Sequence, residues 1–124
     1  MPRHAILLFA HGARDPEWAS PIEALRDRVA LLAPDCRVAL AYLEFIPPDL
    51  AGAVAALADL GIADVTIVPV FLAQGGHLKR GLPALVEGLR VAHPAMSFEV
   101  LPAIGEQPPV IEAIAACVAR IAAR

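Results

Sequence analysis

Two histidines and one glutamate stand where apolar segments of the chain end. His11 directly follows the apolar run 5–10, His77 lies just beyond the run 65–72, and Glu44 follows a third such segment. Imidazole binds Fe, Co, Ni, Cu and Zn and is a base near neutral pH, and a carboxylate completes a site with open coordination positions. These three residues are therefore candidate metal ligands and proton acceptors.

A structural role is the alternative for each of them. A lone histidine is usually a hydrogen-bonded surface or core residue, but His11 and His77 are each adjacent to glycine at an expected strand end, which favours function. His4 and His93 lack that placement and are assigned structural roles. For Glu44, capping a helix or pairing with a cation is as good an interpretation as a site role.

Cations and glycines lie close to both histidines in the sequence. Residues 74–76 predict a backbone-lined turn, which is either a simple tight turn or a surface for a flat ligand. The nearby cations can hold the carboxylates of a ligand or be solvated surface charges: Arg14, Lys79 and Arg80.

The apolar segments themselves predict strands. Each is short and rich in aliphatic residues, as expected for strands buried on both faces of a parallel sheet. Apolar residues at helical spacing follow each strand. The expected strands are 5–10, 37–43, 65–72 and 97–101, and the expected helices begin near Asp15, Leu50, Pro83 and Val110.

This alternation predicts one α/β domain over residues 1–124. Helical crossovers require a mainly parallel sheet with right-handed connections, so we expect a four-stranded, three-layer sandwich of flavodoxin-like form. The carboxyl ends of parallel strands share one edge of the sheet. His11, Glu44 and His77 should therefore converge there, where ligands bind in open α/β sheets.

Composition narrows the function classes. The net charge of −3 argues against nucleic-acid binding, which needs a concentrated basic face. The N-terminal apolar run is too short for a signal peptide or a membrane anchor. Cys36 and Cys117 show no zinc-site spacing, so free thiols and a cytoplasmic protein are expected. With 58% hydrophobic and 19% charged residues, the chain has apolar surface to offer a partner subunit.

Three motifs resemble the small CbiX family, sirohydrochlorin chelatases related to class II ferrochelatases. They are FAHGARDP at 9–16, LEF at 43–45 and VPVFLAQGGHLKRGLP at 68–83, and the resemblance extends over nearly the whole chain in order. It implies a chelatase-like lobe that inserts Co²⁺ or Fe²⁺, with Ni²⁺ as a further candidate, into sirohydrochlorin. The product would enter cobalamin or sirohaem synthesis, and no permanently bound cofactor is implied.

The resemblance also implies roles for particular residues. His11 and His77 correspond to the family's metal ligands, His11 also to its proton acceptor, and Glu44 to a family glutamate. Pro47 stands where relatives often carry a second acidic residue. The family's tetrapyrrole-contacting loop corresponds to residues 72–77, which implies substrate contacts from Leu72, Ala73, Gln74, Gly75 and Gly76. The nearby cations are expected to orient the carboxylates of the substrate: Arg14, Lys79 and Arg80.

Two other functions fit part of this pattern. A histidine phosphatase also begins with a strand leading to histidine and glycine, but its arginine before the histidine is replaced here by Ala10. A carrier that binds metal or tetrapyrrole without turnover is the remaining alternative, kept open by Pro47. We also expect a homodimer, because larger class II chelatases resemble two such lobes in one chain.

Overall fold

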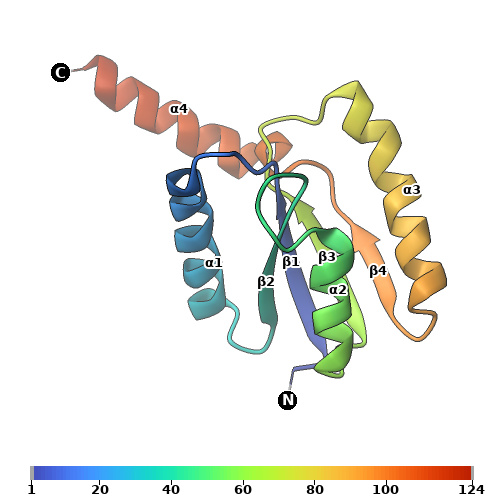
Figure 1. The fold of residues 1–124 in the computed structure, drawn as a ribbon. Helices are drawn as coiled ribbons and strands as arrows, with labels where there is room; N and C mark the ends of the chain where they lie inside the picture. Colours follow the sequence, from blue (N-terminus) through green and yellow to red (C-terminus); the bar gives the residue numbers. More distant parts are fainter. Residues whose placement is uncertain (1, 124) are drawn as a thin grey trace.

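The strands form one parallel sheet in the order β2-β1-β3-β4 (Figure 1). The computed structural model describes residues 2–123, with the side chains of all of these except His77. The strands are β1 (His4–Ala10), β2 (Arg37–Tyr42), β3 (Asp64–Pro69) and β4 (Ser97–Val100); the helices are α1 (Ser20–Leu32), α2 (Leu50–Asp59), α3 (Gly76–Ala92) and α4 (Pro108–Ala122), with short 3₁₀ turns η1 (Pro16–Ala19) and η2 (Ile104–Glu106). The predicted α/β architecture is confirmed.

β1 lies at the centre of the sheet and explains why the core has two halves. Its residues alternate between the two faces. Leu7 and Phe9 pack in one cluster with α2 and α3, whereas Leu8 and Ala10 pack in a second cluster with Tyr42 and the α1 side. A strand covered on both faces has to be apolar throughout, which is why the run reads continuously in the sequence.

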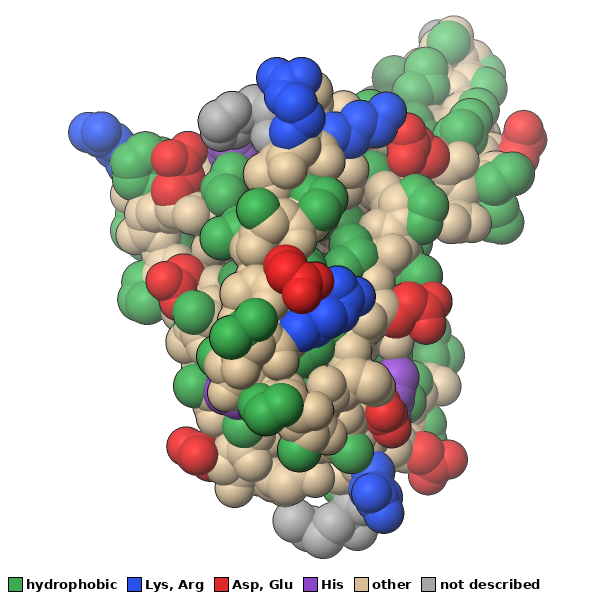
Figure 2. Space-filling model, turned by 90° about the vertical axis from the view of Figure 1, so that its right-hand side faces the viewer, with side chains coloured by type: hydrophobic (Ala, Val, Ile, Leu, Met, Phe, Trp, Pro, Cys, Tyr) green, Lys and Arg blue, Asp and Glu red, His purple; other side chains and the backbone are tan. Residues whose placement is uncertain are grey.

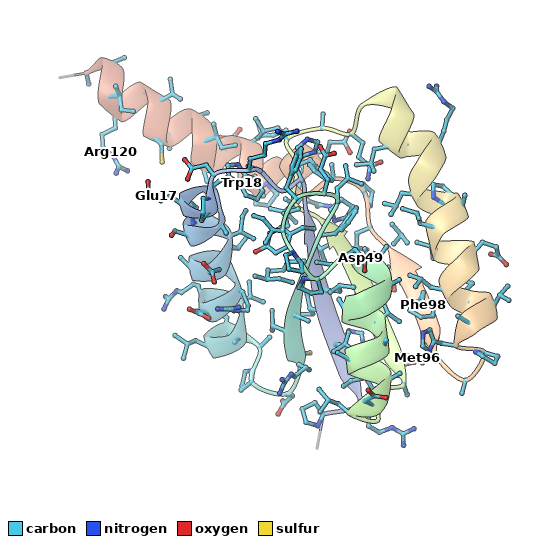
Figure 3. The ribbon with its side chains drawn as sticks, in the orientation of Figure 1. Glu17, Trp18, Asp49, Met96, Phe98 and Arg120 are labelled. Atoms are coloured by element: carbon cyan, nitrogen blue, oxygen red, sulfur yellow. The ribbon has the colours of Figure 1, made fainter. Side chains whose placement is uncertain are left out.

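The face under α2 and α3 is closed by buried aliphatic side chains. The Asp49 carboxylate accepts a hydrogen bond from the Gly52 backbone N–H at 2.8 Å and so caps the start of α2, at the position labelled in Figure 3. Gly61, at φ +80°, follows the C-cap residue of the same helix, in the backbone conformation that commonly ends helices. The buried side chains that α2 and α3 contribute are Leu50, Ala53, Val54, Leu57, Leu82, Val86 and Leu89.

The opposite face is covered less completely. Trp18 from η1 packs edge-on against Tyr42, with ring centroids 6.3 Å apart, and α1 lies over β2. Neither α1 nor α4 contains a buried residue. α4 instead runs away from the sheet in both Figure 1 and Figure 2.

Three predicted boundaries are wrong. The helix expected to begin at Asp15 and Pro16 starts there as the 3₁₀ turn η1, and α1 follows from Ser20. β3 ends at Pro69, before the predicted end at 72, because residues 70–72 are not paired with a neighbouring strand. α3 begins at Gly76 instead of near Pro83, which lies inside the helix; the burial of Leu82 and Val86 in the core offsets the cost of a proline there.

Within residues 2–123, none of the helices is long and apolar enough to cross a bilayer. Cys36 and Cys117 are free thiols, as predicted.

Candidate active site at the carboxyl edge of the sheet

Gly12 allows the loop that carries His11 to lie against the loop that carries Glu44. Its φ of +93° is a backbone conformation that favours glycine. A Cβ placed on Gly12 would lie 1.9 Å from the carbonyl oxygen of Glu44, which is far inside contact distance. The glycine after His11 is therefore a requirement of close backbone packing.

Backbone hydrogen bonds extend the ladder between β1 and β2 beyond the strands. The Leu43 N–H donates to the Ala10 carbonyl at 2.9 Å, and the Glu44 N–H donates to the His11 carbonyl at 3.1 Å. Through these bonds the sheet fixes the relative position of the two candidate residues.

The His11 and Glu44 side chains meet at this edge. Nε2 of His11 lies 3.5 Å from Oε1 of Glu44, and the two side chains are 58% and 48% exposed. An imidazole and a carboxylate facing each other in reach of solvent can exchange protons or share a cation. The predicted convergence is thus confirmed for His11 and Glu44.

Two aromatic residues at the edge were missed in the sequence. The Phe71 ring stands edge-on to the His11 ring at 6.4 Å and also to Phe9 at 6.2 Å, so it supports the imidazole from the core side. Phe45, 54% exposed, lies under the Arg14 guanidinium at 5.0 Å. The signal available in the sequence for both phenylalanines was that each follows closely after an apolar strand.

Residues 70–75 form the loop between β3 and α3. The Val70 N–H donates to the Phe9 carbonyl at 2.8 Å, which holds the start of the loop on the sheet. Leu72 is 71% exposed, Ala73 is exposed and Gln74 is half-buried. The loop presents an exposed apolar surface beside His11.

Gly75 and Gly76 differ from Gly12 in what they require. Gly75, the N-cap residue of α3, has φ −69°, and a Cβ there would meet nothing within 4 Å. A Cβ on Gly76 would lie 3.3 Å from the Arg80 guanidinium, the end of a flexible side chain. Neither glycine has a positive φ, and the open space at Gly75 agrees with the second alternative for residues 74–76, a surface for a flat ligand.

His77 is the second residue of α3, so its backbone lies at the same edge, in the first turn of that helix. The predicted pairing of His77 with His11 falls outside the described part of the chain, because the His77 side chain is not described. Among the described side chains, no cluster of three or more His, Cys, Asp or Glu residues is placed to hold a metal ion.

Lys79 and Arg80 follow in the same helix and are both exposed. The N-terminal N–H groups of a helix and two nearby cations form a positive region suited to carboxylates. The Lys79 N–H already donates to the Gly75 carbonyl at 3.0 Å. Both cations lie at the predicted edge, close in sequence to the loop 70–75.

A recess of about 610 Å³ lies to one side of this edge, between α3 and the end of β4. Of the candidate residues whose side chains are described, Gln74 and Lys79 line it. A second recess of about 450 Å³ contains Glu44, Phe45 and Pro47. The His11–Glu44 pair is thus on an open surface beside two recesses.

Tyr42 is the last residue of β2 and is buried beneath the candidate site. Its pKa is raised chiefly by burial and further by the carboxylate of Glu23, partly opposed by the Arg26 guanidinium. A neutral phenol packed against Trp18 is a structural element and not a candidate acid or base.

Comparison with known protein families identifies the family of the chain. The model of the CbiX family matches residues 5–121. The chain belongs to the CbiX family. A sirohydrochlorin cobaltochelatase of Methanothermobacter thermautotrophicus is 32% identical over 85 residues, and one of Methanopyrus kandleri is 32% identical over 82 residues. These matches cover 68% and 66% of this chain, and 59% and 57% of the length of the relatives.

Solved structures agree on the fold of this CbiX chain. A putative cobalamin biosynthesis CbiX protein from Marinobacter aquaeolei is 32% identical, with a TM-score of 0.86 over 98% of both chains. The sirohydrochlorin chelatase SirB from Bacillus subtilis subspecies spizizenii, solved in complex with cobalt, has a TM-score of 0.83 at 20% identity. It matches 96% of this chain but only 51% of SirB, so the likeness shows one such lobe within a longer chain.

Proposed function

We propose that this CbiX protein inserts a divalent metal, Co²⁺ or Fe²⁺, into sirohydrochlorin at the carboxyl edge of its sheet. The observation that supports this most strongly is the His11–Glu44 pair, 3.5 Å apart on an open edge, in a chain whose family includes sirohydrochlorin cobaltochelatases. The metal is a substrate of this reaction, and it leaves with the tetrapyrrole. The product would serve cobalamin or sirohaem synthesis.

Metal insertion replaces two pyrrole N–H protons with one M²⁺ ion, so two protons must leave as the metal enters. In the proposed mechanism His11 and His77 would hold the metal with Glu44. As His11 releases the metal to the macrocycle, its freed nitrogen accepts one pyrrole proton, and the second proton passes to water. The Glu44 carboxylate stabilises the resulting imidazolium through their contact. Since both side chains are about half exposed, the protons can pass on to solvent.

The same surface is suited to a flat, polyanionic ligand. The exposed Leu72 and the open space at Gly75 would lie against the apolar face of the macrocycle. Arg14, Lys79 and Arg80 would bind carboxylates at its rim, with the remaining contacts from Ala73, Gln74 and Gly76. An open surface leaves the other face of the macrocycle in water, and this supports the expected homodimer.

A direct assay tests this function. Purified protein is mixed with sirohydrochlorin and Co²⁺, Fe²⁺ or Ni²⁺, and the absorption change is followed against the uncatalysed rate. We expect acceleration by at least one of Co²⁺ and Fe²⁺. Binding of tetrapyrrole or metal without acceleration by any of the three ions would instead establish the carrier function.

A further inference from the structure

The backbone bends sharply at Phe45, directly after Glu44. Within residues 2–123, Phe45 is the one residue other than glycine with a positive φ, at +70°. The Ile46 N–H donates to the Glu44 carbonyl at 2.9 Å and closes a three-residue turn around Phe45. A turn with this hydrogen bond and a positive φ at its centre is rare and strained, and a bulky aromatic residue is poorly suited to it. Glycine would adopt the same backbone at lower cost.

The rest of the loop holds this turn in place. The Tyr42 N–H donates to the Pro48 carbonyl at 2.9 Å, which closes the base of the loop. Ile46 is half-buried and packs against the core cluster that contains Tyr42. With Ile46 packed inward, the Phe45 ring remains 54% exposed. The strained turn therefore keeps a large aromatic ring at the surface beside the candidate site, where burial cannot account for its retention.

The exposed ring of Phe45 holds the side chain of Arg14. The guanidinium carbon lies 5.0 Å from the ring centroid, which is a cation–π contact. Arg14 is itself exposed and, within the described part of the chain, forms no ion pair. Its charge is thus open to an external anion, while the ring restrains a side chain that otherwise has many rotamers. The stack lies beside the candidate site, because Phe45 follows Glu44 and Arg14 comes shortly after His11, at the ends of paired strands.

We propose that Phe45 is a positioning residue whose strained turn holds the Arg14 guanidinium beside the His11–Glu44 pair, where it anchors one carboxylate of the tetrapyrrole. This inference rests on the proposed function and adds how its substrate is held. An acidic residue under Arg14 would pair with the guanidinium and compete with the substrate carboxylate, whereas a neutral ring orients the cation without neutralising it. A side chain that is already ordered also loses less conformational entropy when the carboxylate binds.

The first test measures substrate affinity without metal. Sirohydrochlorin is titrated into metal-free protein, and its dissociation constant is obtained from the absorption change. Phe45→Leu keeps an apolar side chain but removes the aromatic face, so it should raise the dissociation constant about fivefold, whereas Phe45→Tyr should bind as wild type does. Leu31→Ala, at the far end of α1 and 72% exposed, is the matched control and should bind unchanged. Binding by Phe45→Leu as tight as wild type would overturn the proposal.

A double-mutant cycle then shows whether Phe45 acts through Arg14. Arg14→Ala should raise the dissociation constant about tenfold, because a charge-assisted contact with the carboxylate is lost. In the Arg14→Ala background, Phe45→Leu should have no further effect, since there is no guanidinium left to orient. Full additivity of the two changes would show that the ring touches the macrocycle itself and would overturn the positioning role.

Urea unfolding tests the strain. Phe45→Gly and Phe45→Ala both remove the ring, but only glycine suits a φ of +70°. Phe45→Gly should therefore unfold at a higher urea concentration than Phe45→Ala, while both variants bind sirohydrochlorin more weakly than wild type to a similar degree. Equal stability of the two variants would show that the turn is unstrained and would overturn this part of the argument.

The outcomes distinguish this inference from the proposed function. A wild-type protein that binds sirohydrochlorin without accelerating metal insertion would remove the chelatase function alone, and the same pattern of dissociation constants would still support the role of Phe45. A wild-type protein that accelerates insertion, with Phe45→Leu indistinguishable from it in substrate affinity, would overturn the role of Phe45 alone. A wild-type protein that does not bind sirohydrochlorin would overturn both.

Discussion

The two faces of the sheet are built from alternate residues of the same strands but are covered very differently. Leu7 and Ile67, under α2 and α3, are 0% exposed. Their neighbours on the α1 side include Ile6, Val70 and Leu101, which are only half-buried. The closed face accounts for the stability of the single chain, and the open face, next to the candidate site, is the one still able to bind something else.

The largest difference in the free energy of unfolding should come from replacing one isoleucine on each face with alanine. Ile67→Ala removes a fully buried side chain and should lower the free energy of unfolding by about 2–5 kcal/mol. Ile6→Ala, on the neighbouring strand but the open face, should cost less than half as much. Urea unfolding of the two variants measures both losses. Equal losses would contradict the contrast between the faces.

A smaller loss is expected at the glycine that joins the His11 and Glu44 loops. Gly12→Ala combines a strained φ with a clash against the Glu44 carbonyl oxygen, so it should cost about 2–3 kcal/mol. Gly61→Ala shares the positive φ but meets nothing within 4 Å, and it should cost about 1 kcal/mol. Thermal or urea unfolding separates the two. Similar losses would mean that the two loops are not in close contact.

The smallest of the stability effects concerns the closed face alone. Asp49→Ala removes the oxygen that caps α2 and should cost about 1 kcal/mol in unfolding experiments. Asp49→Asn keeps a capping oxygen and should lose only a few tenths of that. Equal losses in the two variants would mean that the side-chain oxygen of residue 49 does not cap α2.

The sequence predicted the strands and helices better than it predicted which of their faces are buried. Continuous apolar runs identified all four strands, and the crossover rule gave a parallel sheet with His11 and Glu44 at one edge. The start of α3 was misplaced because glycines and Pro83 usually interrupt a helix, whereas here tertiary packing of Leu82 and Val86 overrides that tendency. The apolar stripe on α4 predicted an amphipathic helix, but periodicity alone cannot tell that the stripe stays exposed within the chain.

The site shows the same division between local pattern and tertiary contact. A histidine followed by glycine was visible in the sequence, and so was the acidic residue after the next strand. The need for Gly12 was not, because it arises from a backbone contact with Glu44, a residue distant in the sequence. The support of His11 by Phe71 also depends on the order of β1 and β3 in the sheet.

Activity variants connect this edge to the proposed reaction. Glu44→Gln keeps the shape of the side chain but removes its charge, so metal insertion should slow about tenfold or metal binding should weaken. His77→Ala should abolish insertion while the fold is retained, which circular dichroism can check. Wild-type kinetics and metal affinity in the Glu44 variant would return Glu44 to a structural role, and unchanged turnover in the His77 variant would remove His77 from the site.

The most direct test of the proposed function is the initial rate of Co²⁺ insertion into sirohydrochlorin by wild type, His11→Ala and His93→Ala. His93 lies at the end of α3, away from the candidate edge, and serves as the matched control. Wild type and His93→Ala should insert metal at equal rates well above the uncatalysed reaction, while His11→Ala falls to the uncatalysed rate with its fold intact. A folded His11→Ala protein that inserts Co²⁺ as fast as wild type would contradict the assignment.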